Sequence, residues 1–204
     1  PVDTELYKPG LPELQLYELN QRNGQFVPRE ERPAVVGCVG QWVYRKNING
    51  FLETMFAGFE QDEVIILLKT YTDRMDSNQK NRCIDEIEGI RKRVGNPRAP
   101  RVVLVTEKLT DEAMARLYAS MDFYVNPSRG EGYCLPLAQA MACGVVAVST
   151  AATAPLDYIE DDLNGFLVDV SMDRAISPTP HPWIDYNQRW ATMNQSHLEA
   201  IIRD

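Results

Sequence analysis

The sequence is poor in the residues that most metal and disulfide sites require. It has two histidines, His181 and His197, and four cysteines, none of which form a Cys-x-x-Cys pair. These numbers and spacings do not complete a metal-ligand set, so we expect no metal site. Four unpaired thiols are typical of an intracellular protein, and we expect a cytoplasmic one.

Long apolar runs and an excess of positive charge are also missing. The longest strand-like apolar run, Val64–Leu68, is far shorter than the roughly 20 residues that span a membrane. The 29 acidic residues outnumber the 21 basic ones, which gives a net charge of −8. Because nucleic-acid backbones select basic surfaces, this balance excludes a general nucleic-acid binder and restricts any phosphate contact to a local site.

What is present suits one large domain with an extension. Of the 204 residues, 44% are hydrophobic, which is enough for a buried core. Several prolines interrupt residues 1–33, so we expect a lead-in or linker there and a folded unit over residues 34–204. Inside that unit, residues 171–195 include three closely spaced prolines, which predict an irregular segment.

From residue 34 onward, short apolar runs alternate with amphipathic stretches. The predicted strands are 34–40, 63–70, 101–106, 122–126, 145–149 and 166–168. Helical spacing of apolar residues separates most of these runs, Asn47 and Thr110 stand at N-cap positions, and a last helix is expected over 196–203. Continuous apolar strands that alternate with helices predict a parallel sheet covered on both faces, a doubly wound Rossmann-like α/β domain.

One stretch, residues 127–144, has the composition of a ligand-binding loop followed by a short helix. Gly130 and Gly132 flank a single carboxylate, Glu131, and Gly144 marks the end of the helix. A glycine-containing loop that leads into a helix N-terminus leaves backbone N–H groups free to bind an anion, usually phosphate. The carboxylate needs a different partner, and hydroxyl groups of the same ligand are the natural ones.

Read together, several segments resemble the donor-binding, C-terminal half of the retaining nucleotide-sugar glycosyltransferases of family 4, which have the two-domain GT-B fold. Ser128–Gly144 (SRGEGYCLPLAQAMACG) is similar to the family stretch EGFGLPxLEAMACG. Val39–Asn47 resembles the segment VGR…KN, and Asp162–Val168 resembles dgxNGxLV. Val2–Pro9 resembles the segment just past the hinge from the N-terminal, acceptor-binding domain, so we expect that domain to be absent from this chain.

The resemblance implies a nucleotide-sugar donor, with a UDP, GDP or ADP group, and neither a metal nor a further cofactor. It implies that Glu131 binds donor-sugar hydroxyls at the reacting carbon, and that a membrane surface is contacted only through the missing domain. The donor-binding residues that it implies are Gly40, Gln41, Arg45, Lys46, Lys108, Leu109, Gly132, Tyr133, Cys134, Leu135 and Gln139.

Two departures from the family pattern leave a second hypothesis open. Gln139 stands where the family has a glutamate that holds the ribose hydroxyls, and Gln41 stands where it has an arginine. A glutamine still donates and accepts hydrogen bonds, but without charge assistance. A catalytically impaired GT-B scaffold or regulatory domain is therefore the alternative to a working enzyme. An epimerase would need further acid/base groups, and Gly37–Gly40 is not the Gly-x-Gly-x-x-Gly turn of a dinucleotide-dependent oxidoreductase.

Overall fold

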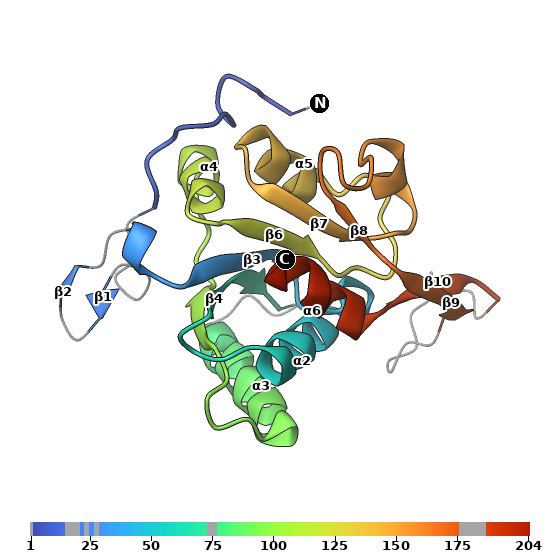
Figure 1. Ribbon diagram of the computed structural model, residues 1–204, viewed down its shortest axis with the longest axis horizontal. Helices are drawn as coiled ribbons and strands as arrows, with labels where there is room; N and C mark the ends of the chain where they lie inside the picture. The colour runs from blue at the N-terminus through green and yellow to red at the C-terminus, as the bar shows by residue number, and fades with distance from the viewer. Residues whose placement is uncertain (1, 15–20, 23–24, 27–28, 73–76, 176–186) are drawn as a thin grey trace.

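A six-stranded parallel sheet forms the centre of the structure, a computed structural model that describes residues 2–14, 21–22, 25–26, 29–72, 77–175 and 187–204 (Figure 1). The strands are β3 (Ala34–Gln41), β4 (Val64–Tyr71), β5 (Arg101–Val105), β6 (Phe123–Asn126), β7 (Val146–Thr150) and β8 (Phe166–Val168). Their order is β5-β4-β3-β6-β7-β8, and every neighbouring pair is parallel. The predicted doubly wound sheet is confirmed, and its order reverses between β3 and β6.

Helices cover both faces of this sheet, as Figure 1 shows. They are α2 (Ile48–Gly58), α3 (Gln79–Val94), α4 (Asp111–Ala119), α5 (Leu135–Ala142) and α6 (Gln195–Arg203). Along β3, Val36 and Cys38 pack with α2, α3 and α6, whereas Val35 packs with α4 and α5. This alternation buries both sides of the central strand, which explains its continuous apolar sequence. Within the described ranges, no helix has the length and apolar character needed to cross a membrane.

The helix ends follow the sequence signals with one difference. The Thr110 hydroxyl accepts a hydrogen bond from the Ala113 amide at 3.3 Å, so Thr110 is the N-cap of α4 as predicted. Gly144 has φ +79° just after α5, which confirms the predicted end of that helix. Asn47 precedes α2 but its side chain makes no capping bond. It accepts instead from Arg129, so the cap position is correct and the capping contact is wrong.

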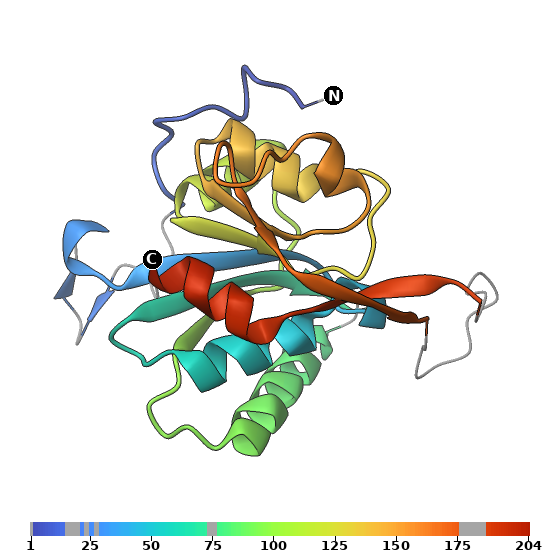
Figure 2. The ribbon, with the colours of Figure 1, turned by 45° about the vertical axis from the view of Figure 1, so that its right-hand side comes forward.

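Beyond β8 the chain leaves the sheet as an arm, which we define as β9 (Val170–Arg174) and β10 (Arg189–Met193) (Figure 2). The two strands are antiparallel, with Arg189 opposite Arg174 and Met193 opposite Val170. The prediction that residues 171–195 are irregular is therefore wrong at both ends of that segment. Residues 176–186, which contain the three prolines, lie outside the described residues.

Residues 2–14 and 29–32 pack against the domain. Tyr7 is 4% exposed and belongs to the core on the side of α4 and α5. The Leu14 amide donates to the Arg116 carbonyl at 3.1 Å and so fixes this segment to α4. Two strands of two residues each, β1 (Gln21–Arg22) and β2 (Gln25–Phe26), pair antiparallel and precede a short 3₁₀ turn, Arg29–Glu31.

Candidate functional site

The loops that follow β3 and β6 meet at the carboxyl edge of the sheet, where the strand order reverses. The first loop contains a 3₁₀ turn, Tyr44–Lys46. The backbone carbonyl of Arg45 accepts from the Arg129 amide at 2.8 Å and from the Ser128 hydroxyl at 3.1 Å. In doubly wound sheets this reversal opens the crevice in which ligands bind. The two loops that the sequence singled out are thus joined directly at the expected position.

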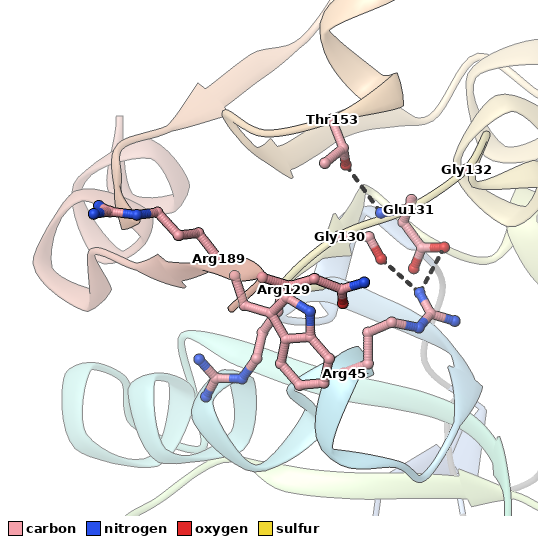
Figure 3. A pocket seen from close by; sticks show the side chains of 9 residues that line it. Arg45, Arg129, Gly130, Glu131, Gly132, Thr153 and Arg189 are labelled. Carbon is pink, nitrogen blue, oxygen red and sulfur yellow. Dashed lines mark hydrogen bonds and ion pairs between the residues drawn. The ribbon is translucent and has the colours of Figure 1, made fainter. Parts of the chain in front are cut away.

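Glu131 is the centre of a compact ion-pair cluster. Its Oε1 lies 2.6 Å from Lys46 Nζ, and its Oε2 lies 3.0 Å from Arg45 Nη1. The same Arg45 nitrogen donates to the Gly130 carbonyl at 2.6 Å (Figure 3). A Cβ atom added to Gly40 would lie 3.5 Å from Lys46 Cδ, so the lysine stem runs close over this glycine. Four of the predicted site residues therefore contact one another or lie in van der Waals range.

The cluster keeps Glu131 ionised at neutral pH. Its side chain is 8% exposed, and burial alone would raise the pKa of the carboxyl. The hydrogen bond and charge of Lys46, the hydrogen bond of Ser128 and the charge of Arg45 outweigh that effect and lower the pKa below its ordinary value. An ionised carboxylate accepts hydrogen bonds but donates none, so Glu131 is suited to binding hydroxyl groups rather than to delivering a proton.

Hydroxyl side chains hold the loop of Glu131 in place. Thr150 Oγ1 donates to the Ser128 carbonyl at 2.7 Å, and Thr153 Oγ1 accepts from the Glu131 amide at 2.9 Å. Thr153 has φ +59° and ψ −147°, a conformation that a β-branched residue rarely adopts. Backbone strain of this kind is concentrated at functional sites, where the surroundings enforce it.

The N-terminus of α5 follows the same loop and presents free amides. The amides of Leu137 and Ala138 bond to the Cys134 carbonyl. The amides of Tyr133, Cys134 and Leu135 find no acceptor among the residues that the structure describes. Together with the helix dipole, these three groups form a position that is suited to an anion.

Cys134, the N-cap of α5, has φ +64° and ψ +63°, the left-handed conformation that glycine adopts without strain. This geometry is the physical reason for the glycine found here in the resembled motif. The thiol is 5% exposed, and burial raises its pKa to about 11. It is therefore protonated at neutral pH and is not an activated nucleophile.

Some predicted residues lie apart from this cluster. The Tyr118 hydroxyl donates to Oε1 of Gln139 at 3.2 Å, so the glutamine already has a partner in the protein. Lys108 and Leu109 follow β5, the outer strand of the sheet, and the structure does not place them among the groove-lining residues around Glu131. Lys108 is exposed, whereas Leu109 packs partly against the core.

An open groove beside Glu131 includes residues that sequence reasoning missed. Its lining is Arg45, Arg129, Gly130, Glu131, Gly132, Thr153, Gln188, Arg189 and Trp190 (Figure 3). Arg129 stands two positions before Glu131 in the recognised motif, which was a signal available in the sequence. Arg189 and Trp190 come from the arm and Gln188 directly precedes β10, and no local pattern indicated that the arm would reach the groove. Within the described ranges, no group of three or more His, Cys, Asp and Glu side chains is arranged to hold a metal ion.

A six-stranded doubly wound sheet with this order, and with a glycine loop, an ion-paired carboxylate and a helix N-terminus at its reversal point, defines one Rossmann-like half of a GT-B glycosyltransferase fold. The chain belongs to the family of glycosyl transferases group 1, whose family model matches residues 33–177.

Two curated relatives match part of the chain. A GDP-mannose-dependent alpha-mannosyltransferase of Corynebacterium glutamicum is 32% identical over 98 residues, which is 48% of this chain and 24% of that protein. A GDP-mannose-dependent alpha-mannosyltransferase of Mycolicibacterium smegmatis is 38% identical over 65 residues, 32% of this chain and 17% of that protein. The matched region thus spans about a quarter or less of either relative.

Solved structures show the same fold at low sequence identity. The C-terminal domain of LpcC, a glycosyl transferase group 1 family protein from Francisella tularensis, aligns with a TM-score of 0.61 and 22% identity, covering 83% of this chain and 80% of that one. Sucrose-phosphate synthase from Thermosynechococcus elongatus gives 0.64 and 21%, covering all of this chain and 42% of that one. Anabaena HepE in complex with UDP gives 0.62 and 18%, covering 99% and 45%.

Proposed function

We propose that this chain is the donor-binding domain of a retaining, metal-independent glycosyltransferase that moves a sugar from a nucleotide donor to a hydroxyl acceptor. The supporting observation is the ionised Glu131 between Lys46 and Arg45, next to the free amides at the start of α5. GDP-mannose is the first candidate donor, because both bacterial relatives are named for it. UDP-glucose is the second, because HepE was solved with it. Such donors and four free thiols suit a cytoplasmic location.

In this proposal two parts of the donor bind at two ends of the cluster. The distal phosphate accepts from the amides of Tyr133, Cys134 and Leu135 and attracts the charge of Lys46. The sugar hydroxyls donate to Glu131. Because Lys46 and Arg45 are already paired with Glu131, donor binding exchanges part of these ion pairs for contacts with phosphate. Lys46 therefore has to be close enough to serve both partners, and its 2.6 Å contact with Glu131 supports this.

The chemical step needs charge stabilisation more than proton transfer by the protein. The bond from the anomeric carbon to the phosphate oxygen breaks, and the acceptor oxygen bonds to the same face of that carbon. The acceptor proton passes to the leaving phosphate. The fixed amides of α5 and the cations of Lys46 and Arg45 stabilise the negative charge that develops. The acceptor domain closes over the site to exclude water, so we expect this chain alone to bind nucleotide without transferring sugar.

Calorimetric titration of the chain with GDP, UDP and ADP tests the donor site. We expect one nucleotide to bind, and Lys46→Met to weaken it by about tenfold or more, since a charge-assisted contact contributes about 1.5–3 kcal/mol. Lys92→Met is the matched control, because Lys92 is exposed and lies in the last turn of α3. Absence of binding by all three nucleotides at high protein concentration would contradict the proposal.

The contact between Gln139 and Tyr118 favours one alternative, a catalytically impaired scaffold or regulatory domain. A glutamine whose oxygen already accepts from the protein is a weaker ligand for ribose than a free carboxylate. Glu131→Ala in the full-length protein separates the two functions. An enzyme loses most of its turnover, whereas a scaffold keeps its cellular role without any measurable transfer.

A further inference from the structure

The arm is fixed to the loop of Glu131 at β10. The Ala191 amide donates to the Arg129 carbonyl at 2.9 Å. The Arg129 guanidinium donates back to the Ala191 carbonyl and to Thr192 Oγ1, both at 3.4 Å. This two-way contact determines where the preceding residue, Trp190, lies. Trp190 is half-buried and lines the groove together with Glu131.

A stack of side chains supports the Trp190 ring. The ring centroids of Tyr44 and Trp190 are 5.8 Å apart, with an interplanar angle of 32°. The Arg129 guanidinium lies 4.5 Å from the Tyr44 ring centroid on a cation–π contact. Tyr44 and Arg129 thus support the indole from one side at the edge of the groove.

The groove has open space next to this surface. A Cβ atom added to Gly132 would meet no heavy atom within 4 Å, and one added to Gly130 would meet only Thr153 Cγ2, at 3.8 Å. Polar residues Glu131, Thr153 and Gln188 line the same space, whereas the Arg189 guanidinium donates to the Met172 carbonyl on the other face of the arm. A pyranose has an apolar C–H face and a rim of hydroxyl groups, so an aromatic surface with polar groups around it matches a sugar ring.

The arm lies on the side of Glu131 away from the proposed phosphate position. In Figure 3, Arg189 is on the opposite side of Glu131 from Gly132, and the chain continues from Gly132 to the free amides of α5. With the donor phosphate at α5 and the donor sugar at Glu131, the next position along the groove belongs to the acceptor.

We propose that Trp190 is the platform of an acceptor subsite that takes a carbohydrate, with a pyranose ring stacked on the indole. The inference rests on the proposed function, because it assigns the acceptor side of the same site. It names the substrate class: the attacking hydroxyl belongs to a sugar, or to a group linked to one, rather than to an isolated lipid or peptide hydroxyl. Trp190 is a positioning residue in this role.

The test follows the indole N–H signals of the three tryptophans by NMR, using this chain saturated with GDP. The probes are methyl α-D-mannopyranoside and methyl α-D-glucopyranoside, with glycerol as a polyol that has no ring. We expect one pyranoside to shift the Trp190 signal and glycerol to leave it unchanged. Trp190→Ala should weaken pyranoside binding by about tenfold or more, and Trp190→Phe, which keeps an aromatic face, should lose less.

Met172→Ala is the matched control for the arm. Met172 is 44% exposed and pairs with Ala191, so it lies on the face of the arm opposite Trp190. We expect this variant to bind the pyranoside like the wild type. An equal loss in Met172→Ala would show that any weakening of the arm reduces binding, which would overturn the role of the Trp190 ring.

The other outcomes separate this inference from the proposed function. If GDP binds but neither pyranoside shifts Trp190, the acceptor subsite is wrong and the donor site stands. If no nucleotide binds, the proposed function fails, whereas a pyranoside that still shifts Trp190 preserves a carbohydrate site.

If Trp190→Ala weakens GDP-mannose but not GDP, the ring contacts the donor sugar. If it weakens GDP itself, the ring belongs to the nucleotide site. Either of these last two results overturns the acceptor assignment.

Discussion

At the scale of single residues, Glu131 shows how one side chain serves both stability and ligand binding. Lys46 and Arg45 hold its two oxygens and keep it ionised in a largely buried position. If Glu131 loses its charge, the two cations lose the counter-charge that balances them in the folded state. The site is therefore also a source of stability, and that stability depends on pH.

Glu131→Gln should lower the free energy of unfolding by about 1–3 kcal/mol at pH 7. Because the folded pKa of Glu131 lies below its unfolded value, the stabilisation is complete above the ordinary carboxyl pKa. It is lost as the pH falls through the lower folded value. Urea unfolding of both proteins from pH 7 into the acid range should show their difference shrinking. Glu88→Gln, at a 62% exposed position, is the control and should change little. A difference that stays constant with pH would contradict the assignment.

The four cysteines should be unreactive in the native protein. All four are free and buried. Burial raises the pKa of Cys38 to about 12 and that of Cys143 to about 11, so almost no thiolate exists at pH 8. Ellman's reagent should therefore react slowly with the folded protein and with four equivalents after unfolding. One rapid equivalent from the native state would show an accessible, activated thiol.

At the scale of elements, the arm depends on a contact between segments that are distant in sequence. Arg129 follows β6 and joins β10 through its guanidinium, which also donates to Asn47 at the start of α2. One planar side chain thus connects three elements around the groove. A lysine has the same charge but no fork of donors, so it cannot reproduce this geometry.

Arg129→Lys should loosen the arm without unfolding the sheet. Loss of one or two hydrogen bonds, about 1–2 kcal/mol, should speed hydrogen exchange of the β9 and β10 amides by about five- to thirtyfold. Exchange in β3 and β4 should stay unchanged. Arg174→Lys is the matched control, because Arg174 is exposed on β9. Equal exchange in the two variants would show that Arg129 does not hold the arm.

At the scale of the whole molecule, residues before the sheet complete the structure of the domain. Glu13 lies 2.8 Å from Arg32 and 3.0 Å from Arg29. The Arg32 side chain is 2% exposed and also donates to the Ser120 carbonyl after α4. The described part of residues 1–33 therefore inserts a buried arginine with its own counter-charge against the end of α4, in addition to supplying Tyr7 to the core.

Glu13→Gln should destabilise the whole domain by about 2–3 kcal/mol, because it removes the counter-charge of a buried arginine. Glu5→Gln, in the same segment but at an exposed position, should have almost no effect. The midpoints of urea unfolding at pH 7 give the comparison. Equal stability of the two variants would mean that residues 1–14 are only loosely attached.

The nature and order of the elements could be predicted from the sequence, because their signals are local. Continuous apolar strands, Thr110 at a helix start and Gly144 at a helix end each depend on neighbours within a few residues. The loop with Glu131 was also found in this way, from its glycines and the helix that follows. The arm was missed, because antiparallel pairing of β9 with β10 depends on contacts across residues 175–188.

By itself, then, the sequence determined the doubly wound sheet, the glycine loop of residues 127–144 and the single carboxylate within it. Only the tertiary structure decided what that carboxylate contacts, since Lys46 is 85 residues away in the chain and meets it where two strands end. It also decided that Gln139 contacts Tyr118, and that Trp190 lines the groove while Lys108 does not. Contacts of this kind depend on which loops converge at one edge of the sheet, and that convergence is a property of the strand order rather than of any local pattern.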